Sequence, residues 1–341
     1  MRRSRAEQLV LTPADGGAPI VVFAETRDAG ELTTQDVFQV SPDGAYLAYA
    51  AYGDLHIRAA DGSERLLTDY SRFDHMRFSP DSAYLVANIG DARGDHPERV
   101  VLFDLASGAT RELATFTSVS SLEWMRDRVV VQAWDSKRQR EVLAALPLNG
   151  ERTILLERPS SDISRFVAAA TGTRVVAFVS DANATHVLSI DAAAPAEPVE
   201  LGVVHDPVTN AAATLDGARI AFTTSAALFT ITDSEPPRAI SERSYIQSLW
   251  FARDGRLGYA STSSATIIDS AGAHRFDSDG PVAMLRFDPQ SSRALVATPT
   301  HAWDISTATP KRIATMPRGR VLLGVDQFAG GLVTWTTEAP R

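Results

Sequence analysis

The sequence predicts an all-β fold in which a four-stranded antiparallel sheet is repeated along the chain. Three observations lead to this prediction: short apolar runs alternate with polar residues, tight-turn signals separate the runs, and the pattern recurs about every 40 residues. Residues 37–68, VFQVSPDGAYLAYAAYGDLHIRAADGSERLLT, show the repeated unit most clearly. A lone meander of this size cannot bury both of its faces, so each unit needs neighbours.

The first unit contains four strand signals in order. VFQV alternates large apolar side chains, as a strand with one buried face does, and SPDG supplies a type I turn. AYLAYAA is the second expected strand and ends at Gly53-Asp54. DLHIRA alternates again, ADGS makes another tight turn, and ERLLT is the fourth strand.

The unit recurs with decreasing similarity until the end of the chain. The last copy begins VLLGVDQFAGG and has only two strands, whereas QLVLTP and PIVVFAE near the N-terminus offer a strand pair without a partner. We therefore expect residues 1–26 to supply the outer strands of a closing blade and residues 320–338 its inner strands. The turns between first and second strands are expected at Asp43, Asp81, Asp127, Thr171, Asp216, Asp254, Asp288 and Asp326.

Four strands in a repeat of about 40 residues are typical of β-propeller blades. We predict an eight-bladed propeller, with seven blades as the alternative if one weak copy is an insertion. The ring is expected to close through the blade shared between the two chain ends, because an open ring would leave sheet edges unpaired. No linker composition interrupts the chain, so residues 1–341 are expected to form one domain.

The SPDG turns followed by LAY or LVA, and strand ends such as DLASGATRELA, resemble the TolB-like propeller repeat and the broader WD-repeat group. FDLASG and WDIST stand where WD repeats carry their signature, although the full Gly-His…Trp-Asp pairing is missing. The resemblance covers nearly the whole chain and implies the fold. It implies no particular activity, because propellers carry many unrelated functions.

Composition excludes several function classes. The net charge of −9 and the pI of about 5.3 argue against a general nucleic-acid interface. The absence of cysteine excludes disulfides and thiolate metal sites. The basic start MRRSRAEQLVLTPADGG lacks an apolar secretion segment, and no apolar run has the length of a membrane helix. We expect a cytoplasmic protein, or a periplasmic one if the sequence was trimmed.

The sequence offers no strong catalytic motif. Gly-x-Ser-x-Gly does not occur, and the residues are used up by the propeller, so the hydrolase domain of prolyl-oligopeptidase-type enzymes is not expected. The seven histidines are scattered without metal-ligand spacing, and turn formation explains the recurring aspartates. We expect no metal and no cofactor. Most tryptophans are expected to pack between blades, with Trp134 as the exception.

The strongest candidate for a docking surface is the face that carries the links between blades and the loops between second and third strands. Blades two and three have long, charged loops there, IGDARGDHPERV and WDSKRQREV. Arginine with aromatic side chains suits a protein interface, although such loops can also be merely solvated. The predicted partner-binding residues are Arg93, Asp95, His96, Arg99, Trp134, Lys137, Arg138 and Arg140, with Tyr70, Arg72 and Phe73 from the neighbouring links.

We therefore expect a non-enzymatic module that binds another protein as a scaffold or regulatory subunit, with neither nucleic acid nor membrane as a partner. Two alternatives stay open. One is a lyase-like or lactonase-like propeller enzyme, and the other is a sensor of a small ligand, each with its site at the mouth of the central channel.

Overall fold

The computed structural model describes most of the 341 residues. Residues outside the description are 1–3, 14–16, 29–37, 52–53, 69–70, 74, 92–95, 160–161, 234, 243–244, 289, 308, 330 and 339–341. The described part consists of β-strands joined by turns and short loops. Within that part, no helix has the length and apolar character needed to cross a membrane.

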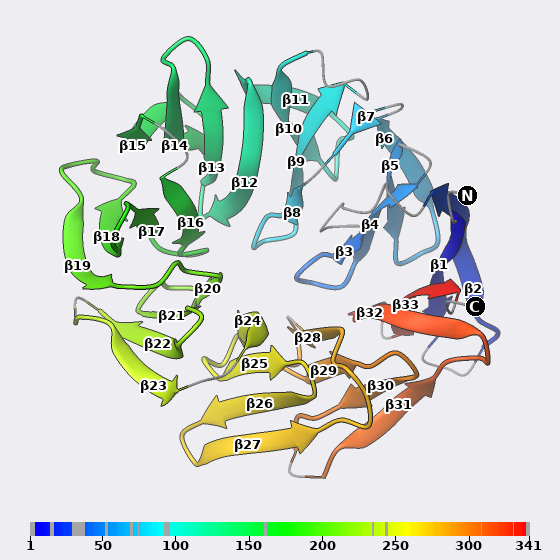
Figure 1. Ribbon diagram of the computed structural model, residues 1–341. Helices are drawn as coiled ribbons and strands as arrows, with labels where there is room; N and C mark the ends of the chain where they lie inside the picture. Colours follow the sequence, from blue (N-terminus) through cyan, green and yellow to red (C-terminus); the bar gives the residue numbers. More distant parts are fainter. Residues whose placement is uncertain are drawn as a thin grey trace. The chain divides into compact units, whose positions relative to one another are not determined.

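The described strands form eight antiparallel sheets: seven have four strands, and one has five because its inner strand is in two pieces (Figure 1). The eight-bladed β-propeller prediction is confirmed, and the seven-bladed alternative is wrong. By contacts between residues the chain divides into two compact units, residues 1–69 with 246–341 and residues 70–245, and each holds four blades. The expectation of a single domain stays a prediction.

Unit 1 contains three blades that are continuous in the sequence. The first consists of β3 (Phe38–Val40), β4 (Tyr46–Ala51), β5 (Asp54–Ala59) and β6 (Glu64–Thr68). The second consists of β24 (Ile246–Phe251), β25 (Leu257–Ser261), β26 (Ser264–Asp269) and β27 (Gly272–Asp277). The third consists of β28 (Met284–Phe287), β29 (Ala294–Ala297), β30 (His301–Asp304) and β31 (Lys311–Thr315).

The fourth blade of unit 1 joins the two ends of the chain, as the sequence predicted. Its strands are β1 (Ser4–Thr12), β2 (Ile20–Asp28), β32 (Arg320–Phe328) and β33 (Gly331–Glu338), in the order β2-β1-β33-β32. The central pairing is antiparallel and runs from Glu7 opposite Thr337 to Thr12 opposite Leu332 (Figure 1). Backbone hydrogen bonds therefore fasten the first strand of the chain to the last.

Unit 2 contains four blades in sequence order. The first has its inner strand in two pieces, β7 (Ser71–Arg72) and β8 (Met76–Phe78), followed by β9 (Tyr84–Asp91), β10 (Glu98–Asp104) and β11 (Thr110–Phe116). The second has β12 (Ser118–Met125), β13 (Arg128–Asp135), β14 (Arg140–Pro147) and β15 (Thr153–Arg158). The third has β16 (Ile163–Ala168), β17 (Arg174–Ser180), β18 (Thr185–Asp191) and β19 (Val199–Val204). The fourth has β20 (Asn210–Ala213), β21 (Arg219–Thr223), β22 (Ala227–Thr232) and β23 (Arg238–Glu242).

The hydrophobic core lies between successive blades. In unit 1, Leu9 and Phe23 of the closing blade pack with Phe38, Leu47 and Tyr49 of the next blade. In unit 2, similar clusters of buried aliphatic side chains join each blade to its neighbour. Middle strands are buried on both faces, which explains why they read as continuous apolar runs such as RVVAFVS.

The recurring turn aspartates hold turns between first and second strands. Asp43 Oδ1 accepts hydrogen bonds from Ser41 Oγ at 2.6 Å and from the Ala45 N–H at 2.9 Å. The equivalent pair of bonds recurs at Asp81 and at Asp216. These local hydrogen bonds explain why aspartate recurs at the turns, and no catalytic role is needed to account for it.

Asp326 was predicted at such a turn, and that prediction is wrong. It lies within β32 opposite Val333, and the β32–β33 turn follows Phe328, which pairs with Gly331. The sequence VDQFAGG contains two turn signals, and the chain turns after Phe328, at Ala329, instead of at the aspartate. Asp326 is thereby left buried inside the sheet.

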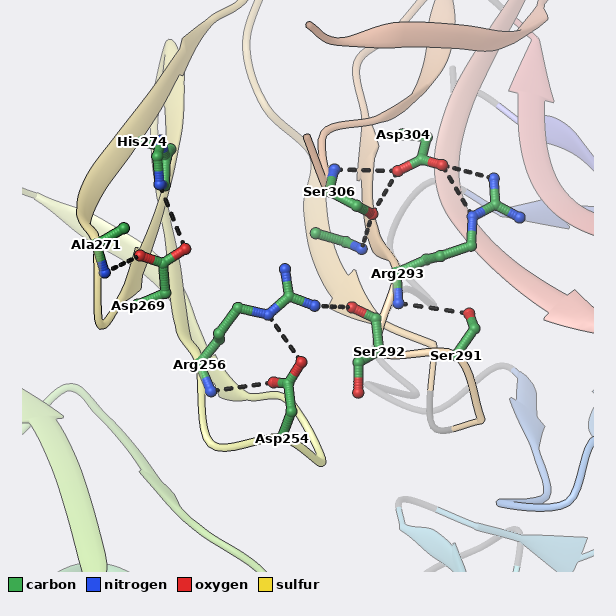
Figure 2. A network of polar contacts seen from close by, with 11 residues as sticks. Asp254, Arg256, Asp269, Ala271, His274, Ser291, Ser292, Arg293, Asp304 and Ser306 are labelled. Carbon is green, nitrogen blue, oxygen red and sulfur yellow. Dashed lines mark hydrogen bonds and ion pairs between the residues drawn. The ribbon is translucent and has the colours of Figure 1, made fainter. Parts of the chain in front are cut away.

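In both units, an arginine at the start of a second strand connects its blade to the following blade. Arg256 donates from Nη2 to the Ser292 carbonyl at 2.6 Å, across two neighbouring blades of unit 1 (Figure 2). In unit 2, Arg174 Nη1 donates to the Gly217 carbonyl of the following blade at 3.1 Å. Because guanidinium carries several donors, one side chain can hold its own turn and the neighbouring one together.

We predict that Leu9→Ala destabilises the protein, because Leu9 is fully buried in the core that the closing blade shares with its neighbour. The expected loss of unfolding free energy is roughly 2–5 kcal/mol. Leu66→Ala, on an outer strand at 54% exposure, is the matched control and should change it by less than about 0.5 kcal/mol. Urea unfolding measures both variants, and equal losses would contradict the assignment of this core.

Candidate functional site

One end of the β13–β14 strand pair is a tight turn, residues 135–140, which is called the charged hairpin below. Asp135 pairs with Arg140 in register, so residues 136–139 alone make the turn. The sequence led us to expect a longer loop here. The two strands instead stay paired up to the turn, and the charged side chains are presented on a short, regular hairpin.

Two arginines share one buried carboxylate at the charged hairpin. Asp135 lies 3.7 Å from Arg138 and 3.6 Å from Arg152. Arg138 also forms an ion pair with Glu157, and the Arg152 guanidinium lies 5.2 Å from the centre of the Phe116 ring. These contacts hold Arg138 and Arg152 in defined positions, so their orientation is set before any partner arrives.

Lys137 and Arg140 differ from these arginines. Both side chains are exposed, and within the described part of the chain no carboxylate forms an ion pair with either. The backbone N–H of Lys137 donates to Asp135 Oδ1 at 3.1 Å. The charged hairpin therefore presents two cations whose charge is not matched locally.

The structure places the remaining predicted residues in different settings. Tyr70, Arg93 and Asp95 lie outside the described residues, as does the side chain of Arg72. Phe73 is only 5% exposed and packs inside the protein, so it is not on a surface that a partner would meet.

Three further predicted residues lie near the loop side of the same two blades. His96 and Arg99 are exposed where the chain enters β10, and Trp134 is half-buried at the end of β13. Together with the charged hairpin they belong to unit 2.

Two acidic residues of the predicted loops point inward instead of toward solvent. Glu141 Oε2 accepts the Ile163 N–H at 3.0 Å, and Glu98 Oε2 accepts the Val119 N–H at 2.8 Å. Each bond joins the third strand of one blade to the first strand of the next. Burial raises the pKa of Glu141. This role could not be recognised from the sequence, because a glutamate at the start of a strand looks the same whether it faces solvent or a neighbouring blade.

A second group of charged and aromatic side chains, called the first-strand cluster, lies in unit 1. Arg286 on β28 forms an ion pair with Asp326 on β32 at 2.6 Å. Its guanidinium lies 5.7 Å from the centre of the Phe38 ring and 5.8 Å from that of Trp250. Cations are attracted to aromatic faces at these distances. Side chains of β3, β24, β28 and β32 therefore converge on one arginine.

The electrostatics of the first-strand cluster favour a close ion pair between Arg286 and Asp326. Burial raises the pKa of Asp326, while Arg286 and the Gln327 N–H, which donates to Asp326 Oδ1 at 2.9 Å, oppose the rise. The neighbouring Asp288 carboxylate adds to the rise. An anionic ligand would have to displace Asp326 to gain the full charge of Arg286.

Sequence reasoning missed this cluster for two reasons. Asp326 was assigned to a turn, and Trp250 was assigned to packing between blades. Trp250 is in fact 42% exposed, whereas Trp124 is buried and donates from Nε1 to the Arg77 carbonyl at 2.8 Å. Arg286 stands in an alternating strand, and only the spatial neighbours of that strand reveal its partners.

A third cluster, on the outer half of a blade in unit 2, contains a titratable histidine. His186 Nδ1 lies 2.7 Å from Glu200 Oε2, and its Nε2 lies 3.1 Å from Asp181 Oδ2. The hydrogen bonds with Glu200 and then Asp181 raise the pKa of His186 above its ordinary value of 6.5. Both ring nitrogens are occupied by carboxylates. Among the described residues, no group of three or more histidine or carboxylate side chains is arranged so that it could hold a metal ion.

Comparison with known proteins supports the fold and leaves the function open. No protein-family model matches the sequence, and no curated protein matches it significantly. Solved structures do match: the β-propeller domain of Cps50 (Swd1) from Myceliophteria thermophila has a TM-score of 0.55 at 16% identity, covering 82% of this chain and 96% of that domain. The Dos1 propeller has a TM-score of 0.59 at 11% identity, covering 87% and 90%. The chain is thus similar to WD-repeat-like propellers.

Peptidases are also among the structural neighbours. The acylaminoacyl peptidase of Pyrococcus horikoshii matches with a TM-score of 0.54 at 12% identity. The match covers 81% of this chain but 49% of the peptidase chain, so it reaches about half of that enzyme. Similarity at this level shows a shared propeller fold and carries no activity with it.

We predict that Asp326→Asn destabilises the protein by roughly 3–5 kcal/mol, because it leaves the charge of Arg286 buried without compensation. The double variant Arg286→Met/Asp326→Leu should recover most of this loss. Urea unfolding of the three proteins measures the difference, with the exposed Asp277→Asn as a control. If Asp326→Asn were as stable as the parent protein, the ion pair between Arg286 and Asp326 would make no net contribution to stability.

The His186 cluster gives a pH prediction with a definite sign. Because the pKa of His186 in the folded protein lies above 6.5, protonation favours folding: the contribution is complete below pH 6.5 and is lost as the pH rises through the folded pKa. Replacing the neighbour in Glu200→Gln should lower the pKa of His186, as followed by NMR titration of its ring protons. A pKa that does not change in this variant would contradict the assignment.

Proposed function

We propose that this protein is a non-enzymatic module that binds another protein, as a scaffold or regulatory subunit. The observation that carries the proposal is the charged hairpin, a short and internally bonded turn with exposed cations on a propeller scaffold. A loop whose geometry is set before binding loses less conformational entropy when a partner docks. Recognition of this kind needs no catalytic group.

The comparisons support the coarser part of this proposal. The β-propeller domain of Cps50 (Swd1) and the Dos1 propeller match this chain over at least 90% of their own length, so the propeller fold accounts for nearly all of both matched chains. The finer part, that docking uses the charged hairpin with His96, Arg99 and Trp134, stays a proposal. Arg72, Tyr70, Arg93 and Asp95 are retained in it as sequence-based members.

A second function is favoured by one observation. Arg286 and Asp326 reach the first-strand cluster from two blades, beside the exposed ring of Trp250. Converging charged and aromatic side chains are also what a propeller enzyme or a small-ligand sensor would need. Thermal-shift screening of anionic and aromatic compounds distinguishes this function from the first. A compound that stabilises the parent protein but not Trp250→Ala would favour a ligand or substrate site at the first-strand cluster.

We predict that Arg138→Glu/Arg140→Glu abolishes binding of the physiological partner. The partner is identified by affinity capture from the native host and then purified, so that direct binding can be measured. Loss of the Arg138 ion pairs should cost at most about 1 kcal/mol of stability, because the Arg138 side chain is half exposed and buried Asp135 keeps its contact with Arg152. A variant that stays folded by circular dichroism and binds the purified partner as well as the parent would remove the charged hairpin from the interface.

A further inference from the structure

We propose that the charged hairpin receives an acidic segment of the partner protein, that is, a short stretch rich in aspartate and glutamate. This inference rests on the proposed function and specifies the chemistry of the surface that the partner brings.

The hairpin is held in place by bonds on several sides. The Ser136 N–H donates to Thr117 Oγ1 at 3.1 Å, which fastens the turn to the link from the preceding blade. Within the turn, the Arg138 N–H donates to the Asp135 carbonyl at 3.1 Å and Gln139 Nε2 donates to the Ser136 carbonyl at 2.7 Å. The cations are therefore presented by a backbone whose position is already fixed.

The local charge is positive although the chain as a whole is acidic. The charged hairpin carries Lys137, Arg138 and Arg140, and Arg152 reaches it through Asp135. The carboxylates that form ion pairs there are Asp135, with Arg138 and Arg152, and Glu157, with Arg138. Both carboxylates are taken by Arg138 and Arg152, which leaves the charge of Lys137 and Arg140 exposed. The net charge of the chain is −9, so this patch is opposite in sign to the chain as a whole and would orient an acidic segment of a partner during approach.

The available donors suit carboxylates. Arg140 can offer a bidentate pair of N–H donors to one carboxylate, and Lys137 can offer its ammonium to another. Each exposed ion pair contributes only about 0–1 kcal/mol, so binding needs several acidic residues in a row and should weaken with salt. A nucleic acid is less suitable, because the net charge is strongly negative and Trp134, half-buried, offers no fully exposed stacking surface.

The test uses a fluorescein-labelled decaglutamate peptide and measures its binding to the full chain by fluorescence anisotropy. A neutral glycine–serine peptide of the same length is the reference. We expect the acidic peptide to bind, and its affinity to fall as salt rises from about 50 to about 200 mM. Lys137→Glu/Arg140→Glu should raise the Kd at least about tenfold.

A matched control separates the patch from the overall charge. Arg253→Glu/Arg318→Glu changes the net charge by the same amount at two exposed arginines of unit 1, and should alter the Kd by less than about twofold. Both double variants are checked by circular dichroism and thermal melting, because only folded proteins enter the comparison.

Three outcomes would overturn the inference. The acidic peptide could fail to bind more tightly than the neutral one, the two double variants could lose affinity equally, or a decathymidylate oligonucleotide could bind as tightly as the peptide. In each case the proposed function survives if the purified physiological partner still binds the parent protein and not Arg138→Glu/Arg140→Glu. Failure of the acidic-segment inference is thus distinguishable from failure of the interaction function.

Discussion

The structure depends on covering the two faces and the edges of small, strongly apolar sheets. A single four-stranded blade is too small to bury both faces by itself, so each blade is stable only against its neighbours. In unit 1 this requirement is met where β1 pairs with β33, since that pairing completes a blade and supplies the surface on which Leu47 and Tyr49 pack. The same need explains the arginine and glutamate bonds that connect successive blades.

The sequence predicted the fold well because its signals are local. Period-two alternation, SPDG-like turns and repeat spacing each depend on residues close together in the chain, and the shared closing blade followed from counting strands. The error at Asp326 arose because two turn signals stand side by side in VDQFAGG. The chain turns after Phe328 and not at Asp326. Local signals locate a turn to within a few residues, whereas the exact register is decided by the partner strand.

The candidate sites were predicted less completely, since they depend on contacts between blades. The charged hairpin was recognisable because its charges are consecutive in the sequence. The first-strand cluster was not, because Phe38, Trp250, Arg286 and Asp326 are far apart in the chain and meet only in the fold. The role of Glu141 could not be predicted either. It stands in a charged stretch of the sequence, yet its side chain is buried and its carboxylate accepts the Ile163 N–H.

The pairing of β1 with β33 has a consequence for how the protein is made. On the ribosome, β1 emerges long before its partner strand at Gly331–Glu338 is translated, because the two strands are separated by most of the sequence. At about 5–20 residues per second, the edge of β1 waits on the order of tens of seconds before it can be covered. During this interval Leu9 and Leu11 lack their final neighbours, and the nascent chain is most exposed to chaperones and to aggregation.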